Sequence, residues 1–358
     1  MRREFTLTLV ALALLALTAC SVETEVTPPN PSQGDEISFG SVSTRVDSAS
    51  EIEEFSVWAT VSSIGSNAVS YQPLLTNERV YRNPAGSNTW AYDNVQRWLP
   101  NSIFHFFAAY PYNIGFEQVR GESENGNLLT GYALNVTADG SADTEDILVA
   151  TNATDTTVEG YDETVVLQFT HLLTKVNLKI RQDFNKDPDF DYFVTKVTIT
   201  GLKSSGTFGI MPYSSEEPYY FSGWNIDNTT TFTIQKTFDT PQILRAYGEP
   251  DPKNKIINTW EDGILLIPQE IAANSVKVRI DYLYDITPGD GDPGTTNHYV
   301  EGYLPTNIIN QETRENLWQS GRSINYTLKV AEQNDITFAQ PTINPWGSPQ
   351  TGGTIIIK

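Results

Sequence analysis

Short apolar runs dominate the hydrophobic pattern of this chain. In most of them apolar or β-branched residues alternate with polar ones, and Gly, Asn, Asp or Pro then interrupts the pattern. A period of two is typical of β-strands. The pattern predicts strands at residues 55–61, 103–110, 165–169, 172–181, 193–200, 229–234, 263–267, 275–284, 298–304, 324–330 and 354–357. Helical periodicity is weak throughout, with one short candidate at 311–318.

The number of strands and the length of the chain together indicate an all-β protein with more than one domain. The 358 residues exceed twice the roughly 150 residues of a common domain. Because parallel sheets would require crossover helices, the strands favour antiparallel sandwiches. Residues 201–215 are rich in Gly and Ser and are the best linker candidate, which predicts domains at 36–205 and 213–358. A rival boundary lies at 153–162, where polar residues also interrupt the pattern.

The start of the chain has the pattern of a bacterial lipoprotein signal. Two arginines near the start precede an apolar run at 6–17 that is too short to span a bilayer comfortably, and small residues then lead to Cys20. We predict that residues 1–19 are a signal peptide and that Cys20 becomes a lipid-bearing N-terminus anchored in a membrane. The alternatives are an ordinary secretory signal with a chance cysteine near the cut, or a buried free thiol. Residues 20–35 are polar and proline-rich, which predicts a disordered spacer.

Composition excludes several classes of protein. The chain has 44 Asp and Glu against 23 Lys and Arg, a net charge of -21, which would repel a nucleic-acid backbone. Cys20 is the only cysteine, so no intrachain disulfide or multi-thiolate metal site can form. Hydrophobic residues make up 39% of the chain and supply enough apolar surface for packed cores.

The search for catalytic, cofactor or metal chemistry yields no strong candidate. Neither a GxSxG nor an HExxH motif occurs. Residues 289–294 match GxGxxG but lead toward a strand rather than a helix, so they are interpreted as a hairpin loop. The acidic loop at 183–191 matches a calcium loop only in part, because Pro188 stands where the turn needs glycine. The three histidines, His105, His171 and His298, lie in aromatic strands and are interpreted as structural. No enzyme activity, metal or cofactor is expected.

Aromatic and apolar motifs follow one another along the chain in a fixed order. They are Trp90-Ala91-Tyr92 with Trp98-Leu99-Pro100, then 104–111, 146–150, 169–176, 264–269 with 276–282, and 318–321 with Tyr326-Thr327-Leu328. In this order they resemble the fimbrillin family of surface lipoproteins, the subunits of type V pili. The motifs cover most of the mature chain.

The resemblance implies a fold and a mode of assembly. It implies two tandem transthyretin-like β-sandwiches, export as a lipoprotein to the outer membrane, and cleavage there by an Arg-specific surface protease. The first strand then leaves, and a strand from another subunit fills the emptied groove. A partner strand can satisfy such a groove with main-chain hydrogen bonds and alternating side chains. The partners would be further fimbrial subunits, of the same or another kind, in a fimbria that supports adhesion.

The predicted cut lies between Arg45 and Val46. Arg45 is the only basic residue between Cys20 and Arg79, and it lies in a segment of small polar residues that suits an exposed connection. The resemblance, in which a Thr-Arg pair marks the maturation cut, favours the same position. The released strand would be 36–40, with Ile37 and Phe39 on the face that fills the groove.

The predicted donor strand lies near the end of the sequence. Residues 354–357 have strong β preference, and Ile355, Ile356 and Ile357 place apolar side chains on both faces, which is unusual for a strand left in water. The alternative is that this segment is the last strand of the chain's own second sandwich.

Two other functions remain open at this stage. The first is a surface glycan-binding lipoprotein, because 7 Trp and 17 Tyr could offer stacking platforms. The second, ranked well below it, is a β-sandwich hydrolase with two carboxylates facing each other in a cleft. Whether the chain would serve as stalk, tip or anchor of a fimbria is not settled by the sequence.

Overall fold

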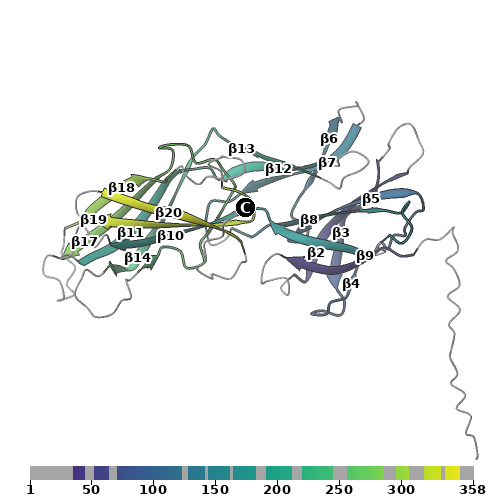
Figure 1. Ribbon diagram of the computed structural model, residues 1–358, viewed down its shortest axis with the longest axis horizontal. Helices are drawn as coiled ribbons and strands as arrows, with labels where there is room; N and C mark the ends of the chain where they lie inside the picture. Colours follow the sequence, from purple (N-terminus) through teal and green to yellow (C-terminus); the bar gives the residue numbers. More distant parts are fainter. Residues whose placement is uncertain are drawn as a thin grey trace, which may run out of the picture.

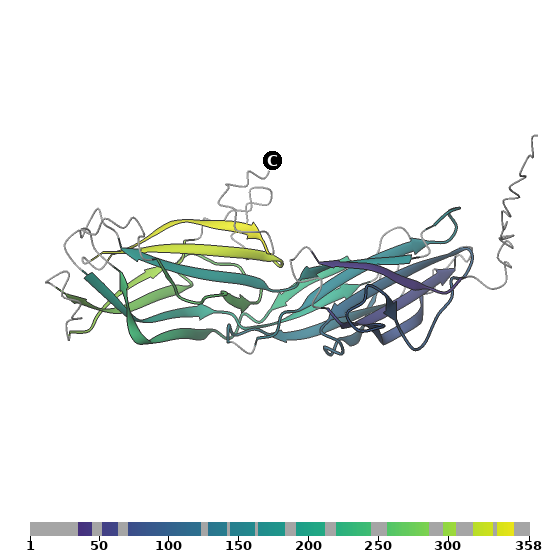
Figure 2. The same ribbon diagram turned by 90° about the horizontal axis from the view of Figure 1, so that it is seen from below.

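The computed structural model describes residues 35–44, 52–63, 71–122, 128–141, 144–161, 164–182, 191–211, 220–244, 256–285, 296–305, 318–331 and 335–346. These residues form four β-sheets in an elongated arrangement, and no helix occurs among them (Figures 1 and 2). Within this part of the chain, therefore, nothing helical is long and apolar enough to cross a bilayer. The all-β prediction is confirmed.

Sheet I lies at one end of the molecule and has the strand order β1-β9-β8-β5-β2-β3-β4. Its strands are β1 (Ser38–Thr44), β2 (Glu54–Ser63), β3 (Tyr71–Arg82), β4 (Trp90–Ala91), β5 (Ser102–Tyr110), β8 (Leu148–Asp155) and β9 (Thr164–His171). The two outermost strands, β1 and β4, approach each other, so the sheet curls around its own inner face.

Sheet II covers the outer face of sheet I and has the order β13-β12-β7-β6. Its strands are β6 (Glu117–Glu122), β7 (Leu128–Thr137), β12 (Ser205–Met211) and β13 (Tyr220–Ile226). The segment 201–215, predicted to be a linker, thus contains a strand, and that prediction is wrong. Phe208 and Ile210 alternate with small residues in β12 and are buried against sheet I, which outweighs the turn tendency of Gly and Ser there.

Sheets III and IV form the other end of the molecule. Sheet III has the order β15-β10-β19-β20, with β16 also paired to β10, and sheet IV has the order β14-β11-β17-β18. The strands of sheet III are β10 (Thr174–Gln182), β15 (Ile257–Asn258), β16 (Ile264–Leu266), β19 (Arg322–Ala331) and β20 (Asp335–Pro345). Those of sheet IV are β11 (Asp191–Leu202), β14 (Phe232–Leu244), β17 (Lys277–Asp285) and β18 (His298–Tyr303). Since β10 and β11 precede residue 205, the division into 36–205 and 213–358 does not coincide with the sheets.

Two strand pairs are parallel, whereas the sequence pattern predicted antiparallel pairing. They are β1 with β9 and β10 with β19. Both pairs join strands that are distant in the sequence, and the chain between them passes through other strands rather than through a crossover helix. The requirement for a helix does not apply to such connections, which explains the difference.

Three hydrophobic clusters hold the sheets together. One lies inside the curl of sheet I, one between sheets I and II, and one between sheets III and IV. Strand β5 contributes to the first two, because Phe104 and Phe106 face the curl while Phe107 and Ala109 face sheet II. Because both faces of β5 are covered, its sequence is a nearly continuous apolar run. Trp58, Trp98 and Trp318 are almost completely buried, and the other four tryptophans are partly buried.

Candidate functional site

The segment 35–44, which contains the first described strand, β1, has main-chain partners from two parts of the chain. On one side it runs parallel to β9, from Ser38 opposite Thr164 to Thr44 opposite Phe169. On the other side the Ile37 N–H donates to the Gln96 carbonyl at 2.9 Å, and the Trp98 N–H donates to the Asp35 carbonyl at 3.0 Å. The segment 35–44 therefore closes sheet I between β9 and the chain that follows β4.

The inward side chains of this segment are almost completely buried. Ile37 is 1% exposed and Phe39 is 6% exposed. The Phe39 ring meets Phe55, Tyr92 and Phe106 edge-on, with centroid distances of 6.4, 5.3 and 6.2 Å. We call the space that these two side chains fill, inside the curl of sheet I, the β1 groove. Burial of each side chain contributes about 1.5–3 kcal/mol to stability.

Tyr92 links the groove to the backbone of its occupant. Its hydroxyl donates to the Ile37 carbonyl at 2.9 Å and accepts from the Gln96 N–H at 3.0 Å. Burial raises the pKa of Tyr92, so the hydroxyl stays protonated and keeps its donor role at neutral pH. This hydrogen bond recognises a main-chain carbonyl and is independent of the side chain that the occupant carries.

The outward contacts of the same segment are weaker. Arg97 pairs with Glu36 at 2.7 Å, but half or more of each side chain is exposed, and such pairs contribute little. The Ser38 and Thr164 hydroxyls lie 3.3 Å apart. Apolar burial and main-chain hydrogen bonds therefore hold β1, and surface charge contributes little.

Only some of the residues singled out from the sequence lie in the part of the chain that the structure describes. Ile37 and Phe39 both lie in the β1 groove, although β1 itself spans 38–44 rather than 36–40. Cys20, Arg45, Val46 and the isoleucines at 355–357 fall outside the described residues, as do the loop at 289–294 and all but the last residue of the helix candidate at 311–318. Of the acidic loop, residues 183–190 are also outside.

Sequence reasoning did not assign a role to Tyr92 or Thr164, the residues that meet β1 from its two sides. Tyr92 was noted only as part of an aromatic motif. Thr164 has no chemical signature at all, because its importance comes from strand pairing between residues far apart in the chain. Thr164 could have been identified only if the strand that pairs with β1 had been known.

The three histidines lie in different places and form no common site. His105 is fully buried in β5, and burial lowers its pKa to about 4. His171 Nδ1 lies 2.6 Å from an Asp146 carboxylate oxygen, and its ring stacks on Trp346 with centroids 3.8 Å apart. His298 stacks near Tyr282 at 5.9 Å. No three His, Cys, Asp or Glu side chains gather in a metal-binding group within the described ranges.

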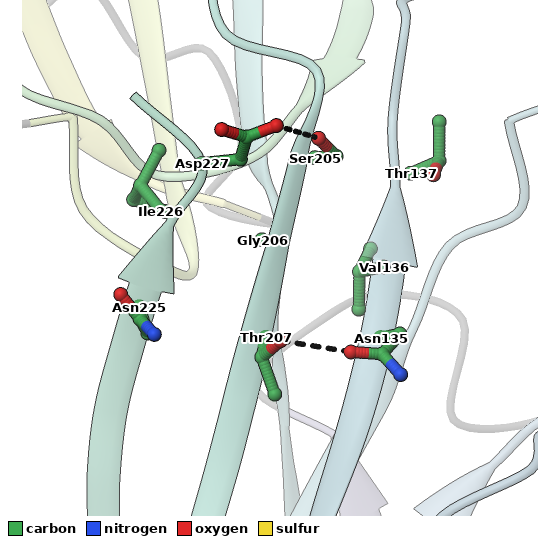
Figure 3. Close-up of a pocket in the computed structure, with 9 residues that line it drawn as sticks. All are labelled: Asn135, Val136, Thr137, Ser205, Gly206, Thr207, Asn225, Ile226 and Asp227. Carbon is green, nitrogen blue, oxygen red and sulfur yellow. Dashed lines mark hydrogen bonds between the residues drawn. The ribbon is translucent and has the colours of Figure 1, made fainter. Parts of the chain in front are cut away.

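Sheet II carries an open polar pocket across β7, β12 and β13 (Figure 3). Its lining consists of Asn135, Val136, Thr137, Ser205, Gly206, Thr207, Asn225, Ile226 and Asp227. The Thr207 hydroxyl donates to Asn135 Oδ1 at 2.8 Å. Hydrogen bonds from the Thr229 hydroxyl and N–H lower the pKa of Asp227, and they commit this carboxylate to the turn after β13. No aromatic side chain lines the pocket.

Among the residues whose exposure the structure describes, the exposed aromatic rings lie on β18. Tyr299 is 52% exposed and Tyr303 is 44% exposed. The Arg279 guanidinium lies 4.0 Å from the Tyr299 ring centroid, and Lys277 Nζ lies 5.8 Å from that of Tyr303. Because a cation covers each ring, the arrangement favours protection of a sheet edge over a platform for stacking sugars.

Comparison with known proteins places the chain among surface structures. A family model described as fimbrillin-like matches residues 44–346. The fold is similar to that of a fimbrial protein from Bacteroides vulgatus, at 20% identity and a TM-score of 0.57, covering 87% of this chain and 100% of the other. Candidate cell adhesion proteins from Bacteroides ovatus (16% identity, TM-score 0.44, 87% and 96% covered) and Bacteroides uniformis (14%, 0.42, 87% and 99%) are also similar. No curated protein matches the sequence.

Proposed function

The chain belongs to the fimbrillin-like family of fimbrial structural subunits, and on that premise we propose that it is exported as a lipoprotein, cut after Arg45 and polymerised by exchange of β1 for a strand from another subunit. In this proposal the lipid on Cys20 tethers the precursor to the outer membrane. An Arg-specific protease at the surface then cuts after Arg45, and residues 20–45, which include β1, leave the chain. The assembled fibre supports adhesion, and no catalytic step by this chain is involved.

The observation that supports exchange most strongly is the position of β1 in the sheet. β1 is the first strand among the described residues, and the strand it pairs with, β9, is not its neighbour in sequence. It belongs to no hairpin, so a single cut between β1 and β2 leaves it attached by non-covalent contacts alone. Arg45 directly follows the last residue of β1, Thr44.

Loss of β1 would leave an empty apolar groove that is unstable in water until another strand fills it. Without Ile37 and Phe39, the rings of Phe55, Tyr92 and Phe106 would be exposed to water. Main-chain groups of β9 and of residues 96–98 would also lose their hydrogen-bond partners. Exposed apolar surface and unpaired strand edges are relieved by strand addition. The sequence-based prediction that Ile355, Ile356 and Ile357 supply the new strand stays a prediction, as does the alternative that they complete the chain's own fold.

The proposal is tested by the N-terminus of assembled material. The full chain is treated with an Arg-specific protease, and polymers that survive SDS are separated and sequenced. We expect ladders whose subunits begin at Val46. The matched variant Arg45→Lys keeps the charge but removes the cleavage site, and it should stay monomeric. Ladders whose subunits retain residues 20–45 would overturn the cut as a step of assembly.

A further inference from the structure

The β1 groove has sharply different requirements at neighbouring positions of its occupant. We infer that it accepts a strand with a large aliphatic residue, one polar residue, an aromatic ring and then glycine, and that its partner is a different subunit carrying such a strand rather than residues 354–357 of a second copy. The inference rests on the proposed strand exchange and specifies its partner.

The first two requirements follow from the sites of Ile37 and Phe39. Both side chains are buried, and Phe39 has an aromatic ring edge-on to it from each of three residues on different elements. A smaller aliphatic side chain at the Phe39 site would leave those rings without a packing partner, and buried cavities of this kind are costly. Ser38, between them, is exposed and can be any small polar residue.

The requirement for glycine follows from a bulge in β1. The pairing with β9 advances three residues in β1, from Phe39 to Val42, for two residues in β9. Gly40 lies in this bulge, where a Cβ atom would come within 2.4 Å of Thr164 Cγ2. Rotation of Thr164 would relieve the clash, but it would also move the hydroxyl that lies 3.3 Å from the Ser38 hydroxyl. Any side chain at this position therefore disturbs the contact of the occupant with Thr164 of β9.

The direction of the occupant is also specified. β1 runs parallel to β9, and its start is held by main-chain hydrogen bonds to Gln96 and Trp98. An incoming strand has to make the same bonds for its aliphatic residue and its ring to reach the two buried sites. The main-chain hydrogen bonds and the two buried sites together fix the register of the strand, because a shift by one residue would turn both side chains outward.

The sequence at the end of this chain does not meet these requirements. If Ile355 and Ile357 occupied the sites of Ile37 and Phe39, Lys358 would take the place of Gly40. If Thr354 and Ile356 occupied them, Ile357 would take that place. Both registers lack the ring and bring a Cβ atom against Thr164.

A closer match occurs within β20, but it is already in use. Residues 335–339 read Asp-Ile-Thr-Phe-Ala, beside Glu-Ile-Ser-Phe-Gly at 36–40. β20 pairs with β19 from Asp335 opposite Ala331 to Pro345 opposite Arg322, so its transfer to another molecule would unpair β19. A strand free to enter the groove is therefore expected from another subunit.

Peptide exchange into the cut chain tests this selectivity. The full chain is cleaved by an Arg-specific protease and mixed with labelled peptides, and complexes are counted by native mass spectrometry. The peptides are 36–44, the same peptide with Phe39→Ala, Gly40→Ala or Gly40→Val, and 351–358. We expect the 36–44 peptide to enter, the Phe39→Ala form to bind about 100-fold more weakly, and the Gly40→Val form at least roughly tenfold more weakly. The 351–358 peptide should not compete.

A reciprocal change in the groove tests the contact with Thr164. The variant Thr164→Ser removes Cγ2 and keeps the hydroxyl, so it should recover binding of a Gly40→Ala peptide while leaving the 36–44 peptide unaffected. Equal binding of the 36–44 and 351–358 peptides, or no recovery in Thr164→Ser, would overturn the inference alone. Failure of the 36–44 peptide itself to enter the cut chain would overturn strand exchange at this groove and the inference with it.

Discussion

The first and the last described strands, β1 and β20, are attached to the fold in different ways. β1 pairs with β9, the residues just before it bond to the chain at 96–98, and Ile37 and Phe39 of this segment are buried, but β1 belongs to no hairpin. β20 forms an antiparallel pair with β19, the strand that precedes it in the chain, and the residue after it, Trp346, is fixed by a hydrogen bond to Gly321 and by the stack on His171. The comparison shows that a strand can make many contacts with the fold without being held in it by a hairpin to a neighbouring strand. The segment that contains β1 fills a groove with two buried side chains, yet a single cut after it would leave it without a covalent link to the rest of the fold.

The largest effect is expected from emptying the β1 groove. Phe39→Ala should lower the free energy of unfolding of the uncut chain by about 3–5 kcal/mol, because it removes a buried ring and leaves a cavity among three others. Urea denaturation measures the change, with Ser38→Ala as the exposed control on the same strand. A loss below about 1 kcal/mol would mean that β1 is only loosely inserted.

The second effect concerns sheet I alone and depends on pH. His105 is buried in β5 with its pKa lowered to about 4, whereas an unfolded chain has a histidine pKa near 6.5. The unfolded state therefore binds an extra proton below about pH 6.5, and stability should fall by roughly 1.4 kcal/mol per pH unit as the pH drops toward 4. The variant His105→Gln should flatten this part of the profile. An unchanged acid profile in His105→Gln would refute the assignment.

The third effect tests the attachment of β20. Trp346→Ala removes the stack on His171 and should cost about 1–3 kcal/mol, less than a core tryptophan because the ring is only partly buried. Hydrogen exchange should accelerate at the β19–β20 pairs near Arg322 while the β1–β9 pairs keep their protection. Faster exchange in β1 instead would mean that the two strands are coupled.

The smallest effect is expected from the surface ion pair of β1. Arg97→Ala breaks the contact with Glu36, and because both side chains are largely exposed the change should cost less than about 1 kcal/mol. Added salt should reduce even that difference. A larger loss, or one that salt does not reduce, would show that charge rather than burial holds the start of the strand.

The contrast between β1 and β20 also shows what the sequence could predict. Apolar residues that alternate in β17 and β19, or run nearly continuously in β5, predicted strands correctly because burial enforces the pattern there. The β12 strand was missed because its glycines and serines resemble a linker, and only its packing against sheet I reveals it. β20 was missed because prolines and polar residues interrupt its apolar pattern. The partner of β1 could not be predicted, since Ser38 and Thr164 are more than a hundred residues apart and neither has a distinctive neighbourhood.

The candidate site was likewise only partly predictable. The alternation Ile37-Ser38-Phe39 indicated which side chains face inward, because side chains alternate along any strand. The bulge at Gly40 and the hydroxyl of Tyr92 depend on tertiary contacts and leave no mark in the local sequence. Sequence reasoning thus identified the strand, and the structure supplied the groove.

The central claim is that β1 must leave before the chain can polymerise, and a reversible covalent lock tests it most directly. Ser38 and Thr164 face each other across the β1–β9 pair, with their hydroxyl oxygens 3.3 Å apart, so Ser38→Cys with Thr164→Cys should allow a disulfide between these strands. The two single variants serve as controls. After Arg-specific cleavage, the oxidised double variant should remain monomeric, and addition of a reductant should restore SDS-resistant ladders. Ladders of equal extent with the disulfide intact would contradict the account, because assembly would then proceed with β1 still in its groove.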